Sequence, residues 1–239
     1  MNKKRFTYAI IPFILTALLL FISYFGNQMY ADIVGNTGKD YSYIFLKFNQ
    51  LVPFLSWTIY PYIIAYPFWV SAFFIIAFYS KDNFYNILAV IFITFIICGL
   101  WYFFFQSDVE AWRVTSGLFL NDNYLTPRTD LNFTEKIVML IYQAAGPRNA
   151  LPSMHTLMSW ITIIGVRHDK TIPKKYKILI WVIALSIIIS TQTLKQHYII
   201  DLIVGMALAE GTYWIVRNTK FVSWIRNLFT KINSKLNLE

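Results

Sequence analysis

The chain has 239 residues, of which 57% are hydrophobic, 19% aromatic and only 14% charged. A soluble domain has no place for so much apolar surface, whereas a bilayer does. The composition therefore excludes a soluble enzyme and a disordered chain, and the single cysteine, Cys98, excludes an intrachain disulfide. The net charge of +9 lies mainly in particular loops, as topology signals do, so no nucleic-acid partner is expected.

Six apolar stretches predict transmembrane helices, since a helix needs about 20 apolar residues to cross the hydrocarbon core. Phe6–Phe25 is the first, and without a small-residue cleavage site after it we expect an uncleaved anchor. The second lies within Leu51–Ser80, where Pro53, Pro61 and Pro67 predict kinks. The other four are Phe84–Phe105, Ser153–Val166, Ile178–Leu194 and Tyr198–Val216.

Two loops and a tail complete the predicted fold. Gly26–Gln50 is expected to be an irregular external loop. Ser107–Leu151 is expected to be a long external loop with a short helix at Asn132–Gln143, capped by Asn132 with Glu135 three residues later. From Phe221 onward, apolar residues share one face and basic residues lie mostly elsewhere, which predicts an amphipathic helix in the cytoplasmic interface.

The fold class predicted from these elements is an all-α polytopic membrane protein with a bundle of six transmembrane helices. Residues 1–218 are expected to form the transmembrane domain and residues 219–239 the interfacial tail. The sequence favours no particular oligomeric state.

The positive residues orient this bundle in the cell membrane. If the termini are cytoplasmic, 14 of the 21 Lys and Arg residues lie inside, including Lys3, Lys4 and Arg5. The outside set is then Lys39, Lys47, Arg113, Arg128, Lys136, Arg148 and Lys195. The positive-inside rule therefore predicts both termini in the cytoplasm and the loop between the third and fourth spans outside.

Ionisable residues near or within spans are candidate functional residues, because charge is costly in a bilayer. Six of them fall at the outer level and come from three distant segments: Arg113, Arg148, His155, Lys195, His197 and Asp201. Such convergence is what a site in a helical bundle needs. Glu210 lies on another side of the last span, where we expect a helix-packing or oligomer contact.

The chemistry of these residues favours phosphoryl transfer. His197 and Asp201 are four residues apart and share a helix face, so the carboxylate can orient the imidazole and raise the basicity of its other nitrogen. Ser153 is a candidate N-cap, and the free N–H groups of a helix N-terminus form an anion site beside His155. The nearby cations add positive charge for a phosphate group.

Other interpretations of the same residues stay open. A histidine at a helix end is usually structural, and Arg or Lys at the headgroup level usually contacts lipid phosphates. His155, His197 and Asp201 could ligate a metal, although a fourth ligand is missing and nearby cations oppose a divalent ion. Ser153 could be a nucleophile, although capping explains it better. The excess of Trp and Tyr is expected at the membrane interfaces.

Two motifs resemble those of the type 2 phosphatidic acid phosphatase superfamily. Residues 149–155, Asn-Ala-Leu-Pro-Ser-Met-His, resemble its Pro-Ser-x-His motif. Residues 195–201, Lys-Gln-His-Tyr-Ile-Ile-Asp, with Ser190 before them and Gly205 after them, resemble its last motif, His-x-x-x-Asp. With the spacing and the six-span layout, the resemblance covers roughly residues 83–214.

The resemblance implies a mechanism that needs no metal or other cofactor. His197 would attack phosphorus and form a phosphohistidine, and Asp201 would orient His197. His155 would protonate the leaving group, while Ser153 and its backbone N–H would hold phosphate oxygens.

The first family motif, a lysine followed by six residues and Arg-Pro, is altered here. Arg113 is retained, but Gln106 replaces the lysine and Val114 the proline. Thr191 stands where an arginine usually follows the serine of the last motif. Lys195 or Arg148 could supply the missing charge. A phosphate-binding site with fewer cations also suits a phosphodiester, which carries one negative charge fewer than a monoester.

The expected function is that of an integral-membrane lipid phosphatase acting at the outer leaflet. Its substrate would be a lipid phosphate or diphosphate: a polyprenyl diphosphate, phosphatidic acid or phosphatidylglycerol phosphate. The first alternative is a phosphotransferase that moves a phosphoryl group or phospho-headgroup to a lipid or sugar hydroxyl. A second alternative is a catalytically silent membrane scaffold, against which the intact His155, His197 and Asp201 argue.

Overall fold

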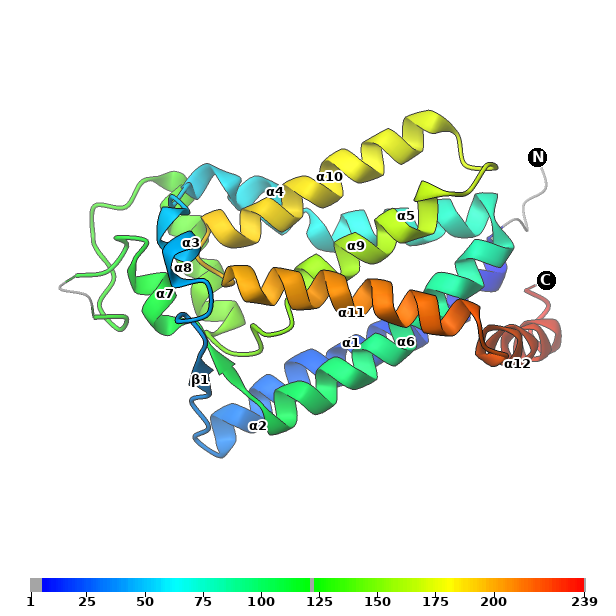
Figure 1. Cartoon of the computed structure of the whole chain (residues 1–239), viewed down its shortest axis with the longest axis horizontal. Coiled ribbons are helices and arrows are strands. Elements are labelled where there is room, and N and C mark those ends of the chain that lie inside the picture. The colour runs from blue at the N-terminus through cyan, green and yellow to red at the C-terminus, as the bar shows by residue number, and fades with distance from the viewer. Residues whose placement is uncertain (1–5, 121–122, 239) are drawn as a thin grey trace.

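The computed structural model describes residues 6–120 and 123–238. Lys3, Lys4 and Arg5, which contribute to the predicted orientation, lie outside the described residues. The described chain is a bundle of long helices, with a cluster of short elements at one end (Figure 1). The predicted all-helical class is confirmed. The two described strands are two residues long and pair in parallel, β1 (Lys39–Asp40) with β2 (Ser107–Asp108).

Five helices are long and apolar enough to cross a membrane. They are Thr7–Ile33, Ser56–Tyr79, Lys81–Phe104, Lys174–Thr193 and Ile199–Arg217. Each corresponds to a predicted span, so the chain has the architecture of a polytopic membrane protein.

The remaining predicted span is α9 (Met154–Arg167), the central helix of the bundle. Its 14 residues correspond to about 21 Å of helix, shorter than the hydrocarbon core. All of its residues except Trp160 and Arg167 are buried, and α5, α6, α10 and α11 surround it. A helix enclosed in this way needs no lipid-matched length, and its role as a sixth span stays a prediction.

The first span is longer than predicted. It comprises η1 (Thr7–Ala9), α1 (Ile10–Leu20), the π-helical turn η2 (Phe21–Gly26) and α2 (Asn27–Ile33). The Asn27 amide donates to the Ser23 and Gly99 carbonyls, which ties this helix to α6 and carries it past Phe25. The predicted irregular loop from Gly26 therefore begins as a helix.

The second span is kinked, as its prolines predict. It comprises η3 (Ser56–Thr58), α4 (Ile59–Ile63) and α5 (Ala65–Tyr79), and the break lies at Ile64. Pro67 has no N–H to offer the Ile63 carbonyl, so the helical ladder is interrupted there. The chain then turns at Ser80, which caps α6 (Lys81–Phe104).

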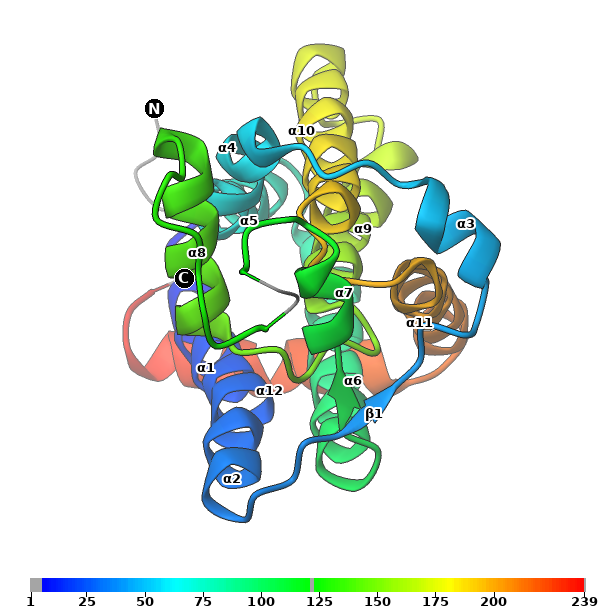
Figure 2. The same ribbon diagram turned by 90° about the vertical axis from the view of Figure 1, so that its left-hand side faces the viewer.

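The short elements gather at one end of the bundle, which faces the viewer in Figure 2. They include α3 (Leu46–Leu51), α7 (Glu110–Val114) and α8 (Phe133–Ala145). The predicted capping box of α8 is present, with Asn132 and Glu135 bonded reciprocally.

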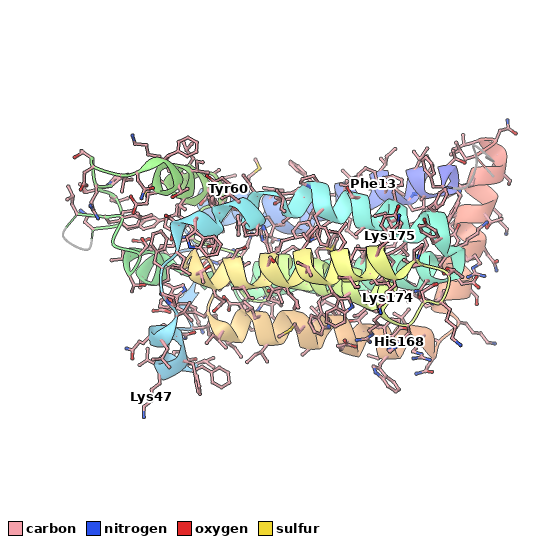
Figure 3. The ribbon with its side chains drawn as sticks, turned by 90° about the horizontal axis from the view of Figure 1, so that it is seen from above. Phe13, Lys47, Tyr60, His168, Lys174 and Lys175 are labelled. Atoms are coloured by element: carbon pink, nitrogen blue, oxygen red, sulfur yellow. The ribbon has the colours of Figure 1, made fainter. Side chains whose placement is uncertain are left out.

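The two chain ends lie at the opposite end of the bundle. The Thr7 hydroxyl donates to the Leu238 carbonyl at 2.5 Å, and Figure 3 shows Lys47 and His168 near opposite ends. The predicted topology places the long loop and the termini on opposite sides in this way. Which side is cytoplasmic stays a prediction.

The C-terminal helix α12 (Phe221–Lys235) packs across the start of the chain. Ile225 and Phe229 are buried, and the Asn233 amide donates to the Tyr8 carbonyl at 2.9 Å. Trp224 is exposed on another face. The helix is present as predicted; the division of the chain at residue 219 and the location of the tail in the cytoplasmic interface stay predictions.

The last two spans are α10 (Lys174–Thr193) and α11 (Ile199–Arg217), joined by a five-residue turn at the end that carries α7 and α8. Toward the other end, the Glu210 carboxylate accepts from Arg167 at 2.5 Å and from Trp160 at 2.8 Å. Glu210 thus makes the predicted helix-packing contact, and it fixes α11 against α9.

Candidate active site

The two histidines of the predicted site lie together in the bundle. His155 stands in the first turn of α9, and His197 lies in the turn between α10 and α11. Their ring centroids are 6.3 Å apart, and both side chains are buried. Segments separated by some 40 residues therefore converge, as the sequence predicts.

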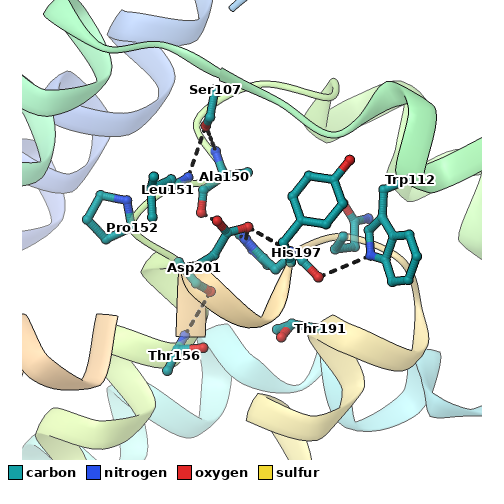
Figure 4. A network of polar contacts seen from close by, with 12 residues as sticks. Ser107, Trp112, Ala150, Leu151, Pro152, Thr156, Thr191, His197 and Asp201 are labelled. Carbon is teal, nitrogen blue, oxygen red and sulfur yellow. Dashed lines mark hydrogen bonds and ion pairs between the residues drawn. The ribbon is translucent and has the colours of Figure 1, made fainter. Parts of the chain in front are cut away.

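His197 is held through its Nδ1 atom (Figure 4). Nδ1 lies 2.9 Å from the Ala150 carbonyl oxygen and 3.4 Å from Oδ2 of Asp201. The same Oδ2 accepts the Tyr198 N–H at 2.8 Å, in a capping box that begins α11. The predicted histidine–carboxylate pair is present, but the Ala150 carbonyl is a second and nearer acceptor for the same Nδ1. Nε2 is left as the nitrogen that can face a substrate.

The surroundings of His197 keep its ring neutral. Burial lowers the pKa of His197 to about 3; the hydrogen bond to Ala150 opposes this shift, and Arg113 adds to it. A neutral imidazole whose proton is held on Nδ1 has its lone pair on Nε2, which is the form that a nucleophile requires.

The start of α9 is bonded directly to α11. Ser153 is the N-cap, since its Oγ accepts the Thr156 N–H at 3.3 Å, and its own N–H donates to the Asp201 carbonyl at 3.1 Å. A Cβ at Gly205 would lie only 3.0 Å from the Ser153 carbonyl oxygen, so glycine permits this close contact. The N–H groups of Met154 and His155 have no intrahelical partner and can serve an anion.

His155 is enclosed by aromatic rings. It stacks on Tyr62 with centroids 4.4 Å apart, and Trp69 lies at 5.2 Å. Its Nε2 is buried and has no hydrogen-bond partner among residues 6–120 and 123–238. A buried, unpaired ring nitrogen needs an explanation, and a bound ligand is one.

Arg113 is brought to the site by α7 and is 2% exposed. Its guanidinium donates to Gln196 Oε1 at 2.5 Å, to the Tyr142 carbonyl at 3.0 Å and to the Tyr124 hydroxyl at 2.8 Å. Gln196 precedes His197, so the cation is fixed beside the turn that holds the nucleophile candidate.

The other two predicted cations have partners elsewhere. The Lys195 ammonium donates to the Val52 carbonyl at 2.5 Å and lies 3.7 Å from the Trp112 ring centroid. Burial lowers its pKa to about 8. Arg148 pairs with Asp32 at the end of α2. That either residue replaces the cations missing at Gln106 and Thr191 stays a prediction.

Gln106 and Thr191 are buried and neutral, and both side chains bond to the protein. Gln106 Nε2 donates to Asn149 Oδ1 at 2.8 Å, and Thr191 Oγ1 donates to the Ile188 carbonyl at 2.7 Å. In the described part of the chain, no three His, Cys, Asp or Glu side chains are grouped so that they could hold a metal ion.

Several residues near the histidines had not been expected there from the sequence. Trp112 and Gln192 donate to the His197 carbonyl at 3.1 Å and 2.9 Å. Trp112 directly precedes Arg113 in an altered family motif, which could have indicated it. Tyr62 and the Ala150 carbonyl had no such signal, because aromatic residues abound in this chain and every residue has a carbonyl.

One comparison with known proteins found a match. A family model described as the PAP2 superfamily matches residues 40–215, most of the chain. No curated protein and no solved structure matches the chain significantly. The matched segment includes both histidines, Asp201 and Arg113, and the resemblance seen in the sequence is confirmed: the chain belongs to the PAP2 superfamily, that of the type 2 phosphatidic acid phosphatases.

Proposed function

We propose that the protein is a lipid phosphatase that removes phosphate from a membrane lipid at the outer leaflet through a phosphohistidine. The observation that supports this most directly is the pair of buried histidines, 6.3 Å apart, with His197 backed at Nδ1 by Asp201 and Ala150. Family membership supports phosphatase or phosphotransferase chemistry, and the apolar helices support a lipid substrate.

The proposed reaction has two steps. In the first, the Nε2 lone pair of His197 forms a bond to phosphorus while the bond from phosphorus to the lipid oxygen breaks. His155, in its protonated form, gives a proton to that oxygen, and Asp201 and the Ala150 carbonyl stabilise the charge that develops on the His197 ring. In the second, His155 takes a proton from water, whose oxygen displaces His197 from phosphorus.

Arg113 and the start of α9 are proposed to hold the phosphate oxygens. Arg113 is fixed beside His197 through Gln196, and the N-terminus of α9 presents N–H groups next to His155. Ser153 supports this site by capping the helix and bonding to Asp201, so we expect its contribution to be structural as well as direct.

The second candidate is transfer of a phosphodiester headgroup, and the small number of cations favours it. Gln106 and Thr191 are neutral, and Lys195 and Arg148 have other partners, which leaves Arg113 beside the turn that carries His197. A phosphodiester carries one negative charge, so one guanidinium can balance it. A hollow of about 270 Å³ lined by Tyr124 and Tyr142, which also contact Arg113, offers space for an acceptor.

A phosphate-release screen tests the leading proposal. Purified protein in detergent is offered polyprenyl diphosphate, phosphatidic acid and phosphatidylglycerol phosphate without added metal, with and without vanadate. We expect release from at least one substrate, inhibition by vanadate, and loss of release in His197→Ala. The control is His168→Ala, since His168 is exposed and lies near the other end of the bundle.

The same screen separates the candidates. Phosphodiester lipids and lipid or sugar hydroxyl acceptors are added to it, and if phosphorus then appears only on an added hydroxyl, the transferase is correct. If no lipid phosphate or diester reacts and vanadate does not bind, the phosphatase proposal fails and the result supports the scaffold alternative.

A further inference from the structure

The segment that follows α6 is hydrogen bonded to the segment that precedes α9. Ser107 Oγ accepts two backbone N–H groups, that of Ala150 at 2.8 Å and that of Leu151 at 2.9 Å. Next to it, Gln106 Oε1 accepts the Asn149 N–H at 2.8 Å, and its amide donates to Asn149 Oδ1. Gln106, Ser107 and Asn149 are each at most 4% exposed. We call Gln106 and Ser107, with their hydrogen bonds to residues 149–151, the Gln106–Ser107 clamp.

The clamp leads directly to the nucleophile candidate (Figure 4). Ala150 donates its N–H to Ser107 Oγ at 2.8 Å, and its carbonyl oxygen lies 2.9 Å from His197 Nδ1. Two hydrogen bonds and one residue, Ala150, therefore separate the Ser107 hydroxyl from the imidazole.

Residues 146–152 belong to no helix or strand, and their one isolated β-bridge, from Arg148 to Asp108, lies two residues before that carbonyl. Asn149 has a left-handed backbone with φ of 57°, and Gly146 has φ of 59°. A carbonyl in such a segment is held only by what the segment is bonded to. The Asn149 amide donates to the Tyr24 carbonyl, and besides the His197 contact itself the clamp supplies the other side-chain hydrogen bonds that the structure gives residues 149–151.

The Asp201 carboxylate lies farther from His197 Nδ1 than the Ala150 carbonyl oxygen does. Its Oδ2 lies 3.4 Å from Nδ1, against 2.9 Å for the carbonyl, and it already accepts the Tyr198 N–H. Nδ1 has a single hydrogen, whose direction fixes where Nε2 points. Because the Ala150 carbonyl is the nearer acceptor, it contributes more than Asp201 to the orientation of the ring.

We infer that Gln106 and Ser107 are positioning residues for the reaction: they place the Ala150 carbonyl against Nδ1 and thereby aim Nε2 of His197. This inference rests on the proposed function. Neither side chain contacts the reacting atoms, and both act through residues 149–151.

Ser107→Ala tests the inference, because it removes the acceptor of two buried N–H groups and leaves every residue proposed to touch the substrate. With the lipid found in the phosphate-release screen, we expect kcat to fall about tenfold or more while KM changes less than about twofold. Ser107→Thr keeps the oxygen and should recover most of kcat.

The matched control is Ser80→Ala. Ser80 Oγ also accepts a backbone N–H, that of Asn83 at 3.4 Å, but it lies at the other end of α6. This variant should keep the kcat of the unmutated protein whatever its effect on the melting temperature. If Ser107→Ala does not fold, Ser107→Cys preserves the volume with a weak acceptor and should show the same selective loss of kcat.

Two results would overturn the inference. One is a folded Ser107→Ala or Ser107→Cys protein with unchanged kcat, and the other is an equal loss of kcat in Ser80→Ala. Both require an active unmutated protein. An unmutated protein that turns over no substrate contradicts the proposed function instead, so the two failures can be told apart.

Discussion

At the scale of single residues, the proposed reaction needs a neutral imidazole held in one orientation. Burial and Arg113 both lower the pKa of His197, and the Ala150 carbonyl and Asp201 hold its Nδ1 proton. The backbone of His197 is held as well, because Trp112 donates to the His197 carbonyl and Lys195 lies over the Trp112 ring. Lys195 therefore acts on the turn through Trp112.

The charge of Lys195 should give activity an alkaline limit. Burial lowers the pKa of Lys195 to about 8, so the ammonium is charged below that pH and loses its proton above it. Its cation–π contact with Trp112 needs the charge. We expect kcat/KM to fall above about pH 8 and the fall to move to higher pH in Lys195→Arg, whose guanidinium stays charged. Identical alkaline limbs in the two proteins would contradict this role.

At the scale of elements, the contact between α9 and α11 brings the two motifs together. The Ser153 N–H donates to the Asp201 carbonyl, and Gly205 lies against the first turn of α9. Farther along the same helices, Glu210 bonds to Arg167 and Trp160. The spacing of His155 and His197 is thus set by how closely these two helices pack.

Gly205→Ala should push the helices apart. The added Cβ would lie 3.0 Å from the Ser153 carbonyl oxygen, 3.4 Å from the Leu157 nitrogen and 3.4 Å from the Thr156 Cβ. We expect a loss of about 1–3 kcal/mol in the free energy of unfolding from overpacking, and a lower kcat. Thermal melts and the phosphate-release assay measure the two effects.

Gly211→Ala is the matched control in the same helix. No atom lies within 4 Å of a Cβ at Gly211, so alanine there should raise stability by roughly 0.5–1 kcal/mol and leave kcat unchanged. Equal effects of the two substitutions would show that the close contact at Gly205 does not set the spacing of His155 and His197.

At the scale of the whole molecule, one end of the bundle holds the histidines and the long loop, and the other holds both chain ends. Thr7 and Leu238 are hydrogen bonded, whereas α7 and α8 lie at the far end of the long axis. A lipid phosphate at the headgroup level can meet the histidines only on the side where the loop lies. The positive-inside rule predicts that this side is the exterior.

Cysteine labelling of intact cells tests that orientation. Leu125 is 85% exposed in the long loop, and Lys170 is exposed at the opposite end, while the native Cys98 is buried. A membrane-impermeant maleimide should label Leu125→Cys in intact cells and Lys170→Cys only after lysis. The reverse pattern would place the site on the cytoplasmic side.

The sequence predicts the parts of this fold that periodicity and composition encode. The long apolar stretches, the break at Ile64 that Pro67 causes and the capping box at Asn132 follow from local patterns, and the convergence of His155 with His197 follows from the predicted order of the spans. The extension of the first span to Ile33 does not, because it depends on the tertiary bonds of Asn27 to another helix.

The site shows the same limit. The residue types of the histidine–carboxylate pair indicate their chemistry, so sequence finds them. The Ala150 carbonyl is a backbone group, and the Ser107 hydroxyl bonds to backbone groups, which have no sequence signature. Lys195 and Arg148 take partners, Trp112 and Asp32, that only the folded chain brings near.

Trapping the phosphoenzyme tests the central claim most directly. The protein is mixed with a lipid phosphate labelled with ³²P, quenched in alkali, digested and mapped by mass spectrometry. We expect acid-labile, alkali-stable label on the peptide that contains His197, and none in His197→Ala. Phosphate release that proceeds with no label on His197, or label that persists in His197→Ala, would contradict the account.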